Sequence, residues 1–584
     1  MGPVGGASAV QARPADDDLV EVVEAWIADD PDPACRAELR ALLDAGERDE
    51  LSRRFRGSLH FGTAGLRGPV RAGPSGMNLA TVRRASAGLA AYLAGSVPHA
   101  LGTRVVVGCD ARHGSQRFAD QTARVFSGAG FRALRLPGQL PTPLLAFAVR
   151  HLTCAAGVMI TASHNPPQDN GYKVYLGNGA QIVPPADEAI STAIGRVGPL
   201  DRVRLGGPGE PVGVDIVGDY LAAIIAALPP SVSHDINTVY TPLHGVGRDV
   251  LLAGFELAGF PAPHVVATQG QPNPDFPTLP KPNPEEAGAL DLAIADARAV
   301  GADLVLANDP DADRLAVAIP DGARPGGWRV LRGDELGALL GDYLLARAPS
   351  PELTITATTI VSSGLLRRLA DAAGVGYAET LTGFKWIMHD SAARSGLRFL
   401  FGYEEAIGYA VNDIVRDKDG ISAALLVAGI AAEAKQQGRT LADRLDDIAR
   451  RFGLYATEEF SLELPGEAGE AHMTQLMAAL RTAPLAEIAG YAVTEIDDVA
   501  TGTRRHADGH VEKLGLPPSD VLVWRCGEKA RVVVRPSGTE PKLKVYLQVV
   551  VPVGPAGDFP AATAAAARQL HRLKADLVPL LEPK

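Results

Sequence analysis

Short apolar runs that end in polar turns recur along this chain, and helical patterns separate them. Residues 104–112 (RVVVGCDAR), 155–163 (AAGVMITAS) and 302–308 (ADLVLAN) each predict a buried strand that leads into a loop. The segment 116–130 (QRFADQTARVFSGAG) predicts a helix between the first two runs. Strands that alternate with helices build α/β sheets, and ligands of open α/β sheets bind beyond the carboxyl ends of the strands. The sequence therefore predicts an α/β protein whose functional residues follow its strands.

The chain is too long for one hydrophobic core. For its 584 residues, the usual size of a domain predicts about four domains. An amphipathic helix is expected over 19–45, and a stretch rich in glycine and proline at 204–214 (RLGGPGEPVGV) predicts the first domain boundary. Further units begin near residues 354 and 460. We therefore predict domains over residues 1–208, 209–330, 331–458 and 459–584.

Composition and charge argue against several classes of partner. The formal net charge is -12, and no cluster of Lys and Arg is dense enough to neutralise a run of phosphates, so nucleic-acid binding is not expected. The longest apolar stretch, ISAALLVAGIAAEA from Ile421, is too short to span a bilayer and predicts a buried helix. The cysteines, Cys35, Cys109, Cys154 and Cys526, form no CxxC pair, and the first residues contain no apolar segment of a signal peptide. We therefore expect a cytoplasmic protein that acts on small molecules without a membrane partner.

Three aspartates alternate in the segment 309–314 (DPDADR), directly after the apolar run at 302–308. In an extended loop, Asp309, Asp311 and Asp313 face the same way and can converge on one hard cation such as Mg²⁺. Without a cation the three charges repel one another, and a solvated turn seldom needs three aspartates in register. The spacing favours a metal site over a solvated turn, and the adjoining Arg314 is placed to contact a phosphate held by the same ion.

Two further loops are ambiguous by themselves. Ser163 follows an apolar run within 161–167 (TASHNPP), but a serine in such a turn is more often structural than nucleophilic. The segment 535–542 (RPSGTEPK) follows the strand pattern KARVVV and combines hydroxyls, a glycine and two cations, which are the ingredients of a phosphate site. A β-turn with incidental charges fits that spacing equally well.

Taken in order, five loops resemble those of the α-D-phosphohexomutase superfamily, which includes phosphoglucomutases and phosphomannomutases. Residues 62–68 (GTAGLRG) resemble the first active-site loop, 161–166 (TASHNP) the phosphoserine loop, 309–314 (DPDADR) the metal loop, 402–409 (GYEEAIGY) the sugar-binding loop and 535–542 (RPSGTEPK) the phosphate-binding loop. The resemblance covers nearly the whole chain. It implies four domains around a central cleft: three similar α/β domains and a smaller C-terminal α+β domain, each of which contributes a loop.

The resemblance also implies roles for individual residues. These are Ser163 as the phosphorylated nucleophile and a metal contact; Asp309, Asp311 and Asp313 as Mg²⁺ ligands; Arg67 and Arg314 on the phosphoryl group; His164 and Lys173 in proton transfer; Glu404, Glu405 and Lys385 on the sugar; and Arg535, Ser537, Gly538, Thr539 and Lys542 on a phosphate. Whether His164 or Lys173 is the base stays open. The implied reaction interconverts sugar 1-phosphate and 6-phosphate through a phosphoserine and a bisphosphorylated sugar. Glucose 1,6-bisphosphate is the expected activator, and the protein is expected to be a monomer or a dimer.

Some residues depart from the hexomutase pattern. Ala406 stands where many members carry a serine, and Pro310 replaces the usual glycine of the metal loop. Tyr403 and the segment 407–409 (IGY) look closer to the branch of phosphopentomutases and glucose-1,6-bisphosphate synthases, which are therefore the alternative activities. A metal-dependent sugar-phosphate phosphatase is a rival outside the mutases, but hydrolysis needs no second phosphate loop. A noncatalytic sensor is disfavoured because the serine and all three aspartates are present.

Overall fold

The computed structural model describes residues 16–97, 101–322, 326–393, 396–464, 466–537, 542–554 and 558–582. The chain divides into two compact units. The first consists of residues 1–230, 234–320 and 412–428, and the second of residues 231–233, 321–411 and 429–584. The serine and aspartate loops belong to the first unit, whereas the glutamate loop and the arginine loop belong to the second.

The first described elements are short helices, not the single helix expected over 19–45. Helix α1 (Asp16–Asp29) ends before a Pro-Asp-Pro sequence, α2 (Pro33–Asp44) begins directly at its second proline, and α3 (Arg48–Phe55) follows. Asp32 caps α2, because its carboxylate accepts a hydrogen bond from the N–H of Ala34. Proline suits the first helical position but cannot continue a preceding helix, so the amphipathic pattern is broken there.

A six-stranded sheet forms the centre of the first unit, in the order β1-β5-β4-β2-β3-β6. Its strands are β1 (Leu66–Pro69), β2 (Arg104–Cys109), β3 (Arg132–Arg135), β4 (Cys154–Ile160), β5 (Asp169–Leu176) and β6 (Glu210–Pro211). The neighbouring strands β4, β2, β3 and β6 run parallel, while β5 is antiparallel to β4 and β1 is antiparallel to β5. Strand β6 lies in the range 209–330 predicted for the second domain, yet it pairs with this first sheet.

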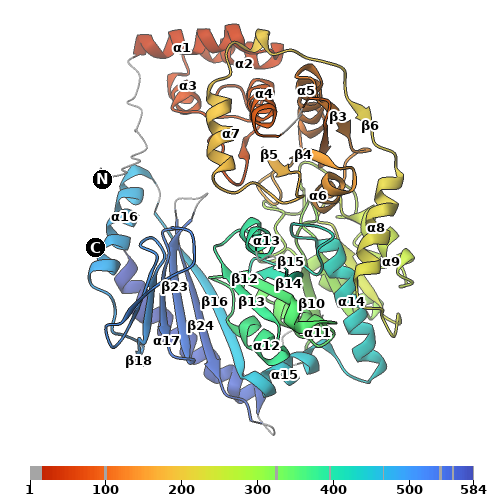
Figure 1. The fold of residues 1–584 in the computed structure, drawn as a ribbon, viewed down its shortest axis with the longest axis vertical. Helices are drawn as coiled ribbons and strands as arrows, with labels where there is room; N and C mark the ends of the chain where they lie inside the picture. Colours follow the sequence, from red (N-terminus) through yellow and green to blue (C-terminus); the bar gives the residue numbers. More distant parts are fainter. Residues whose placement is uncertain are drawn as a thin grey trace. The chain divides into compact units, whose positions relative to one another are not determined.

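Helices cover both faces of this sheet. Figure 1 shows α4 (Leu79–Ser96), α5 (Ser115–Gly128) and α7 (Ala186–Gly195) on one side and α6 (Thr142–His151) on the other. Gly157 lets α6 approach closely, because a Cβ there would lie 2.4 Å from the side chain of Val149. Strands buried on both faces need apolar residues at every position, which explains the continuous apolar runs in the sequence.

A second sheet of the first unit carries the aspartate loop. Four strands of this five-stranded sheet belong to the first unit, in the order β10-β9-β7-β8: β7 (Thr238–Thr241), β8 (His264–Val265), β9 (Leu304–Ala307) and β10 (Ala316–Pro320). Strands β9, β7 and β8 are parallel and β10 is antiparallel. The helices of this part are α8 (Asp215–Ala227), α9 (Arg248–Leu257) and α10 (Asp291–Val300), and a short 3-10 helix, η1 (Leu200–Arg202), precedes them.

The second unit begins with another α/β sheet, in the order β13-β12-β14-β15. After β11 (Trp328–Val330), which is not part of this sheet, the elements in chain order are α11 (Gly333–Leu345), η2 (Pro351–Leu353), β12 (Thr354–Thr359), α12 (Leu365–Ala373), β13 (Gly376–Thr380), α13 (Phe384–Ala393), β14 (Arg398–Glu404), β15 (Gly408–Ala410) and α15 (Leu441–Phe452). Helix α14 (Gly420–Gln436) contains the long apolar stretch and is buried over residues 420–434. The prediction of a buried helix there is confirmed.

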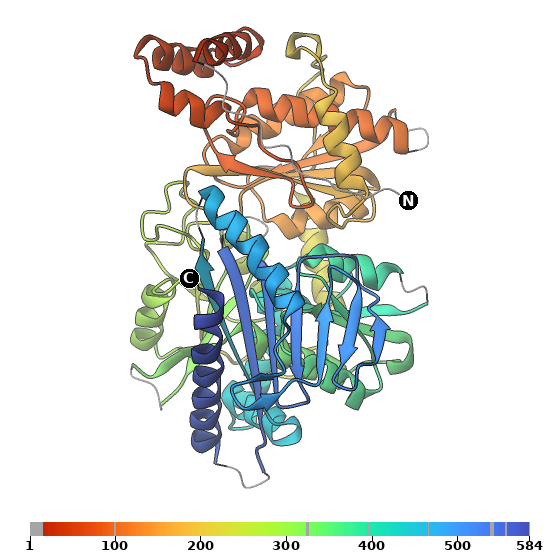
Figure 2. The same ribbon diagram turned by 90° about the vertical axis from the view of Figure 1, so that its left-hand side faces the viewer.

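An antiparallel sheet with helices on one face completes the second unit. Its strands follow the order β16-β24-β23-β22-β19-β20-β21: β16 (Leu454–Glu463), β24 (Lys542–Val551), β23 (Ala530–Pro536), β22 (Leu522–Cys526), β19 (Glu495–Asp498), β20 (Thr503–His506) and β21 (Val511–Lys513). Figure 2 shows α16 (Gly466–Thr482) and α17 (Phe559–Leu581) against this sheet, and both contribute to one core with its strands. A small hairpin pairs β17 (Glu487–Ile488) with β18 (Tyr491–Ala492). None of the helices in the described part of the chain has the length and apolar character that a bilayer span requires.

Candidate active site

Ser163 lies just past the carboxyl end of β4, as predicted, in a strained and buried turn. Its φ is 54°, in the left-handed region, and only 2% of the residue is exposed. Such a conformation costs a non-glycine residue of order 1–3 kcal/mol and persists where the surroundings hold it. The backbone N–H of Ser163 donates to Oγ1 of Thr161 at 2.9 Å, and that hydroxyl donates to Oδ2 of Asp110 at 2.6 Å. The serine is therefore held through residues of two adjacent parallel strands.

Arg112, which the sequence did not single out, holds the rest of this loop. Its guanidinium is buried beside β2 and donates to four backbone carbonyls: those of Ser163 at 2.6 Å, Pro166 at 2.8 Å, Asp169 at 3.0 Å and Asn165. One side chain thus fixes the whole serine turn. The signal in the sequence was an Asp-Ala-Arg segment directly after a buried strand, but only the pairing of β2 with β4 shows what the arginine reaches.

The three aspartates of the metal loop converge as predicted, although the loop is not extended. Asp309, Asp311 and Asp313 are at most 1% exposed, and each offers an oxygen within 4.8 Å of the others. A turn brings them together: the N–H of Ala312 donates to the carbonyl of Asp309 at 2.9 Å, and Ala312 has a φ of 54°. The expectation of alternating carboxylates along an extended loop is therefore wrong. Gly420 is needed beside this turn, because a Cβ would lie 2.9 Å from the carbonyl oxygen of Ala312.

The serine turn and the aspartate turn meet in the first unit. Oγ of Ser163 donates a hydrogen bond of 2.8 Å to Oδ2 of Asp309. Nζ of Lys173, from β5, lies 2.7 Å from Oδ2 of Asp311 and 3.1 Å from Oδ2 of Asp313. Lys418, which the sequence suggested only as part of a charged turn, lies 3.2 Å from the same Asp313 oxygen. Predicted residues from β4, β5 and the end of β9 are thus in direct contact.

The environment of the aspartates fits a hard cation. Among the described residues, Oδ1 of Asp311 and Oδ1 of Asp313 are buried without a hydrogen-bond partner. Burial, with the charges of Asp311 and Asp313, raises the pKa of Asp309 well above its usual value. Burial also tends to raise the pKa of Asp311, but the ammonium of Lys173 outweighs it and lowers that pKa. Buried oxygens with unused lone pairs, and no nitrogen or sulfur ligand among them, are the donor set that Mg²⁺ prefers.

His164 and Lys173 differ in their state of ionisation. Nδ1 of His164 lies 3.1 Å from Oγ of Ser163, and burial, with the positive charges of Arg314 and Arg67, lowers the pKa of His164 well below its usual value. Burial tends to lower the pKa of Lys173 too, but Asp311 and its neighbour Asp313 outweigh it and raise that pKa. The histidine is consequently neutral at pH 7, whereas the lysine is protonated and paired with carboxylates.

The two arginines predicted to hold the phosphoryl group come from different elements of the first unit. Arg67 belongs to β1, where it pairs with Gly171 of β5, and its Nε is buried without a hydrogen-bond partner. Arg314 follows the aspartates: its N–H donates to Oδ1 of Asp309 at 3.0 Å, and its guanidinium lies 3.2 Å from a carboxylate oxygen of Glu285. Both positive charges lower the pKa of His164, the residue next to the serine.

The predicted sugar-binding residues surround the tight turn between β14 and β15 in the second unit. Oε1 of Glu404 accepts a hydrogen bond of 2.7 Å from the N–H of Gly383, two residues before Lys385. Oε2 of Glu405 accepts hydrogen bonds from the hydroxyls of Ser362 at 3.0 Å and Thr359 at 3.2 Å. Burial raises the pKa of Glu405 to about 8, and the nearby acidic groups, Glu404 first, add to the shift. The structure therefore brings both glutamates and the segment of Lys385 together.

The two tyrosines of this segment do not face a sugar. Tyr403 and Tyr409 are fully buried and stack with their ring centroids 6.4 Å apart. The hydroxyl of Tyr403 donates to Oδ1 of Asp334 at 3.0 Å, and that of Tyr409 to the carbonyl of Gly333 at 3.3 Å. They are core residues, so neither can replace the hydroxyl that Ala406 lacks.

Three of the predicted phosphate-binding residues, Arg535, Ser537 and Lys542, are described, where β23 ends and β24 begins. Arg535 is part of β23, and its guanidinium donates to the hydroxyl of Tyr546 at 3.3 Å. The N–H of Ser537 donates to the carbonyl of Lys542 at 2.8 Å and closes the hairpin. Gly538 and Thr539 lie outside the described residues.

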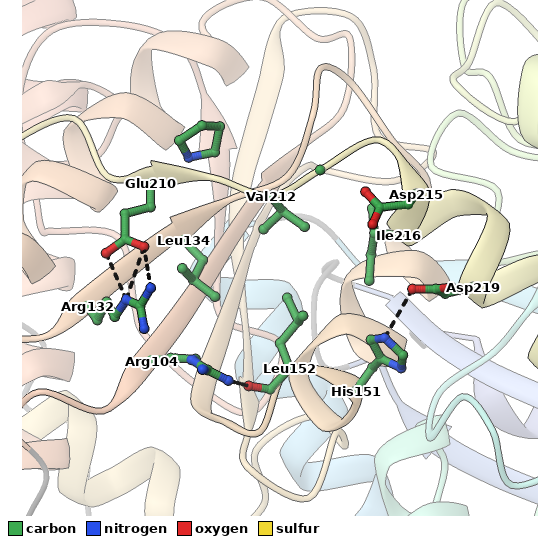
Figure 3. A pocket seen from close by; sticks show the side chains of 12 residues that line it. Arg104, Arg132, Leu134, His151, Leu152, Glu210, Val212, Asp215, Ile216 and Asp219 are labelled. Carbon is green, nitrogen blue, oxygen red and sulfur yellow. Dashed lines mark hydrogen bonds and ion pairs between the residues drawn. The ribbon is translucent and has the colours of Figure 1, made fainter.

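A separate hollow of about 300 Å³ lies at the amino ends of the strands in the first sheet, opposite the serine turn. Figure 3 shows its polar groups engaged with one another: Arg132 with Glu210 at 2.7 Å, His151 with Asp219 at 3.2 Å, and Arg104 with the carbonyl of Leu152 at 2.9 Å. Because these groups satisfy each other, we assign the hollow no part in phosphoryl transfer.

Comparison with known proteins matches four family models in order along the chain. These describe phosphoglucomutase/phosphomannomutase alpha/beta/alpha domain I (residues 58–199), alpha/beta/alpha domain II (219–322), alpha/beta/alpha domain III (332–452) and the C-terminal domain (510–553). Each match falls inside one of the four predicted ranges, and together they bear out three α/β domains followed by a smaller C-terminal domain.

Two curated relatives span most of the chain. A protein of Haemophilus influenzae named as a probable phosphomannomutase is 44% identical over 479 residues, which cover 81% of this chain and 93% of the relative. A protein of Schizosaccharomyces pombe named as a probable phosphoribomutase is 36% identical over 560 residues, which cover 91% and 93%. A crystal structure from Thermus thermophilus, provisionally assigned as a phosphomannomutase, shares the fold with a TM-score of 0.68 at 23% identity and covers 90% of this chain and 100% of that one. The chain therefore belongs to the phosphoglucomutase/phosphomannomutase family of phosphosugar mutases.

Proposed function

We propose that this mutase interconverts the 1-phosphate and the 6-phosphate of a hexose through a phosphorylated Ser163. The observation that carries the proposal is the contact of 2.8 Å between Oγ of Ser163 and Asp309, beside two buried carboxylate oxygens, on Asp311 and Asp313, that lack a hydrogen-bond partner. A nucleophile next to an oxygen-only cation site is the arrangement that metal-assisted phosphoryl transfer requires.

The proposed metal is Mg²⁺, held by Asp309, Asp311 and Asp313 together with Ser163. When bound, it would stabilise the negative charge that spreads over the transferring phosphoryl group. In the chain itself, Lys173 and Lys418 already place positive charge against two of these carboxylates, which limits their mutual repulsion.

His164 is the proposed proton acceptor, and Lys173 the residue that positions the aspartates. A base must be unprotonated and within hydrogen-bond reach of the proton it takes. His164 has a lowered pKa, and its Nδ1 lies 3.1 Å from the serine oxygen, next to which the sugar hydroxyl would approach the phosphoryl group. Lys173 is protonated and occupied by Asp311 at 2.7 Å. Arg67 and Arg314 supply the guanidinium groups that hold the phosphoryl group.

The second unit supplies the proposed contacts to the rest of the substrate. Glu404, Glu405 and Lys385 bind the sugar, while Arg535, Ser537, Gly538, Thr539 and Lys542 bind the phosphate that is not being transferred. Since the bisphosphorylated intermediate presents each of its phosphates in turn, glucose 1,6-bisphosphate is the proposed activator. Three features of the protein stay predictions: the domain limits at residues 208, 330 and 458, the monomeric or dimeric state, and the cytoplasmic location.

A pentose phosphate is the second candidate substrate. The Schizosaccharomyces pombe relative is named for ribose and the Haemophilus influenzae relative for mannose. Ala406 offers no hydroxyl to a hexose, and neither Tyr403 nor Tyr409 replaces it, since both are buried. If Ala406 limits hexose use, Ala406→Ser raises the ratio of hexose to pentose kcat/KM by a few-fold to about tenfold, which is the value of one neutral hydrogen bond.

The experiment that tests the proposal follows the phosphoryl group. The full chain is incubated with glucose 1,6-bisphosphate carrying a labelled phosphate, the labelled peptide is identified by mass spectrometry, and the label is chased with glucose, mannose or ribose monophosphate. We expect label on Ser163, transfer to at least one sugar, and neither in Ser163→Ala. Label on another residue would overturn the phosphoserine mechanism, and release of inorganic phosphate without sugar transfer would make the protein a phosphatase.

A further inference from the structure

Two histidines and a glutamate gather on the hairpin formed by β20 and β21, and a second glutamate lies on the neighbouring strand β19, within the second unit. His506 ends β20, and Glu512 lies in β21. His510 lies between them in a tight turn: the N–H of His506 donates to the carbonyl of His510 at 2.9 Å, and the N–H of Gly509 donates to the carbonyl of His506 at 3.0 Å. The two imidazole rings are consequently held with their centroids 5.4 Å apart.

The ligand atoms of this group are close enough to share one ion. His506, His510 and Glu512 each offer an atom within 4.8 Å of the others. Nε2 of His506 lies 3.6 Å from Oε1 of Glu512. Two ligands of a tetrahedral ion with bonds of about 2.0–2.1 Å are separated by about 3.3 Å, so small side-chain rotations suffice to close the site.

Glu495 is placed to support His506 from the other side. It lies opposite His506 in the register of β19 and β20, and its Oε1 is 3.7 Å from Nδ1 of the ring. A histidine that binds a metal through one nitrogen almost always donates its other N–H to a carboxylate, carbonyl or water, which fixes the ring and its tautomer. The hairpin therefore presents three ligand residues, and β19 adds one carboxylate in the outer shell.

The neighbouring arginine pairs chiefly with a carboxylate outside this group. Arg504, on the same face of the hairpin, forms its shortest contacts with Asp497, at 2.5 Å and 3.0 Å. It lies farther from Glu512, at 3.5 Å, and from Glu495, at 3.6 Å. A second guanidinium, that of Arg525, also pairs with Asp497, at 3.1 Å. Both glutamates therefore share their charge with a guanidinium at 3.5 Å or more, and a bound metal would compete with these longer ion pairs.

We propose that His506, His510 and Glu512 form a binding site for a divalent transition metal such as Zn²⁺, with Glu495 orienting His506. Imidazole and carboxylate ligands together suit Zn²⁺, whereas Mg²⁺ and Ca²⁺ prefer oxygen ligands alone. Three protein ligands leave the fourth position to water, and the exposed side chain of Glu512 leaves that side open to solvent. The site belongs to the C-terminal sheet and is separate from the aspartates proposed to bind Mg²⁺.

The test is a calorimetric titration of Zn²⁺ into the full chain with Mg²⁺ in excess. We expect the wild-type protein to bind one more Zn²⁺ than His510→Ala or Glu512→Gln. Glu495→Gln removes only the outer-shell partner and weakens binding by about 10- to 100-fold. His264→Ala is the matched control, because His264 has one carboxylate neighbour, Asp296 at 3.2 Å, but no place in this cluster.

A further variant separates the two metal sites. Asp311→Asn impairs the aspartate centre and is expected to leave this Zn²⁺ binding unchanged. Equal Zn²⁺ binding in wild type, His510→Ala and Glu512→Gln, or no binding by the wild type, would overturn the proposal. Loss of the Zn²⁺ site in Asp311→Asn alone would overturn it as well, because the ion would then sit at the aspartates.

Discussion

Arg112 offers the sharpest test of how the serine turn is held. In Arg112→Lys the positive charge stays beside Asp110, which lies 3.5 Å away, but the planar guanidinium that reaches four carbonyls between residues 163 and 169 is lost. A lysine has one terminal nitrogen and a shorter side chain, so we expect at least two of the four hydrogen bonds to be lost. The change keeps the positive charge that acts on Asp110 and Asp311 and removes hydrogen bonds to the serine turn, so it tests how that turn is held.

The size of the effect follows from those bonds. A hydrogen bond that involves a charged group contributes about 1.5–3 kcal/mol, so losing two removes about 3–6 kcal/mol from the turn. Ser163 has a φ of 54° and relies on its surroundings to keep that conformation. A shift of about 1 Å in a reacting group lowers the rate about 100-fold, and we expect kcat to fall by about that factor.

The assay compares steady-state turnover with the rate at which glucose 1,6-bisphosphate phosphorylates Ser163, below the temperature at which either protein unfolds. KM should change less than kcat, because the proposed sugar and phosphate contacts lie on other loops. Arg132→Lys is the matched control: this arginine of the first sheet is exposed and pairs with Glu210 on the surface, so its replacement leaves both rates unchanged. If Arg112→Lys keeps kcat within about twofold of wild type, Arg112 does not position the serine and the reasoning fails.

Three further changes test other parts of the molecule. Asp311→Asn removes an anionic oxygen from the metal loop, so the Mg²⁺ concentration that gives half-maximal activity should rise by at least about tenfold. An unchanged dependence of activity on Mg²⁺ would contradict the assignment of Asp311 as a metal ligand. The pKa of Glu405 is about 8 in the folded protein and 4.5 in the unfolded chain, so between these pH values only the folded protein keeps the proton. As the pH rises through this window, the stability of the wild type relative to Glu405→Gln should fall by up to about 1.4 kcal/mol per pH unit. A difference in unfolding midpoint that does not change with pH would refute the shift. Gly420→Ala places a Cβ 2.3 Å from the carbonyl oxygen of Arg314 and should lower the free energy of unfolding, measured in urea, by about 1–3 kcal/mol. Gly218 lies in a helix, and no other atom lies within 4 Å of the position of its added Cβ, so Gly218→Ala should be neutral or stabilising. Equal effects of the two glycine changes would show that crowding at the metal loop is unimportant.

Local patterns in the sequence predicted much of the fold and of the site. The apolar runs at 104–112, 155–163 and 302–308 correspond to β2, β4 and β9, because strands buried on both faces need apolar residues at successive positions. The placement of Ser163 and the aspartates after these strands also follows from local order, since the carboxyl end of a strand lies where its sequence ends. The alternation of Asp309, Asp311 and Asp313 was enough to predict a shared site.

Contacts between distant segments could not be predicted in this way. Arg112 holds Ser163 across 51 residues only because β2 and β4 are neighbours in the sheet, and Lys418 reaches Asp313 from a segment that belongs to the first unit despite its place late in the chain. Tyr403 and Tyr409 belong to the segment that resembles the sugar-binding loop, but packing buries both of them.

The sequence by itself determined the strand and helix periods, the order of the loops and the kinds of ligand atom each loop offers, because these depend on neighbours along the chain. Other features depend on the tertiary structure alone. The aspartates converge through a turn at Ala312, and Lys173 forms ion pairs with carboxylates while His164 faces Ser163. A hairpin places His506, His510 and Glu512 together. Hydrogen bonds and charge effects act over a few ångströms in space, so which groups share that distance is set by strand pairing and packing and not by separation along the chain.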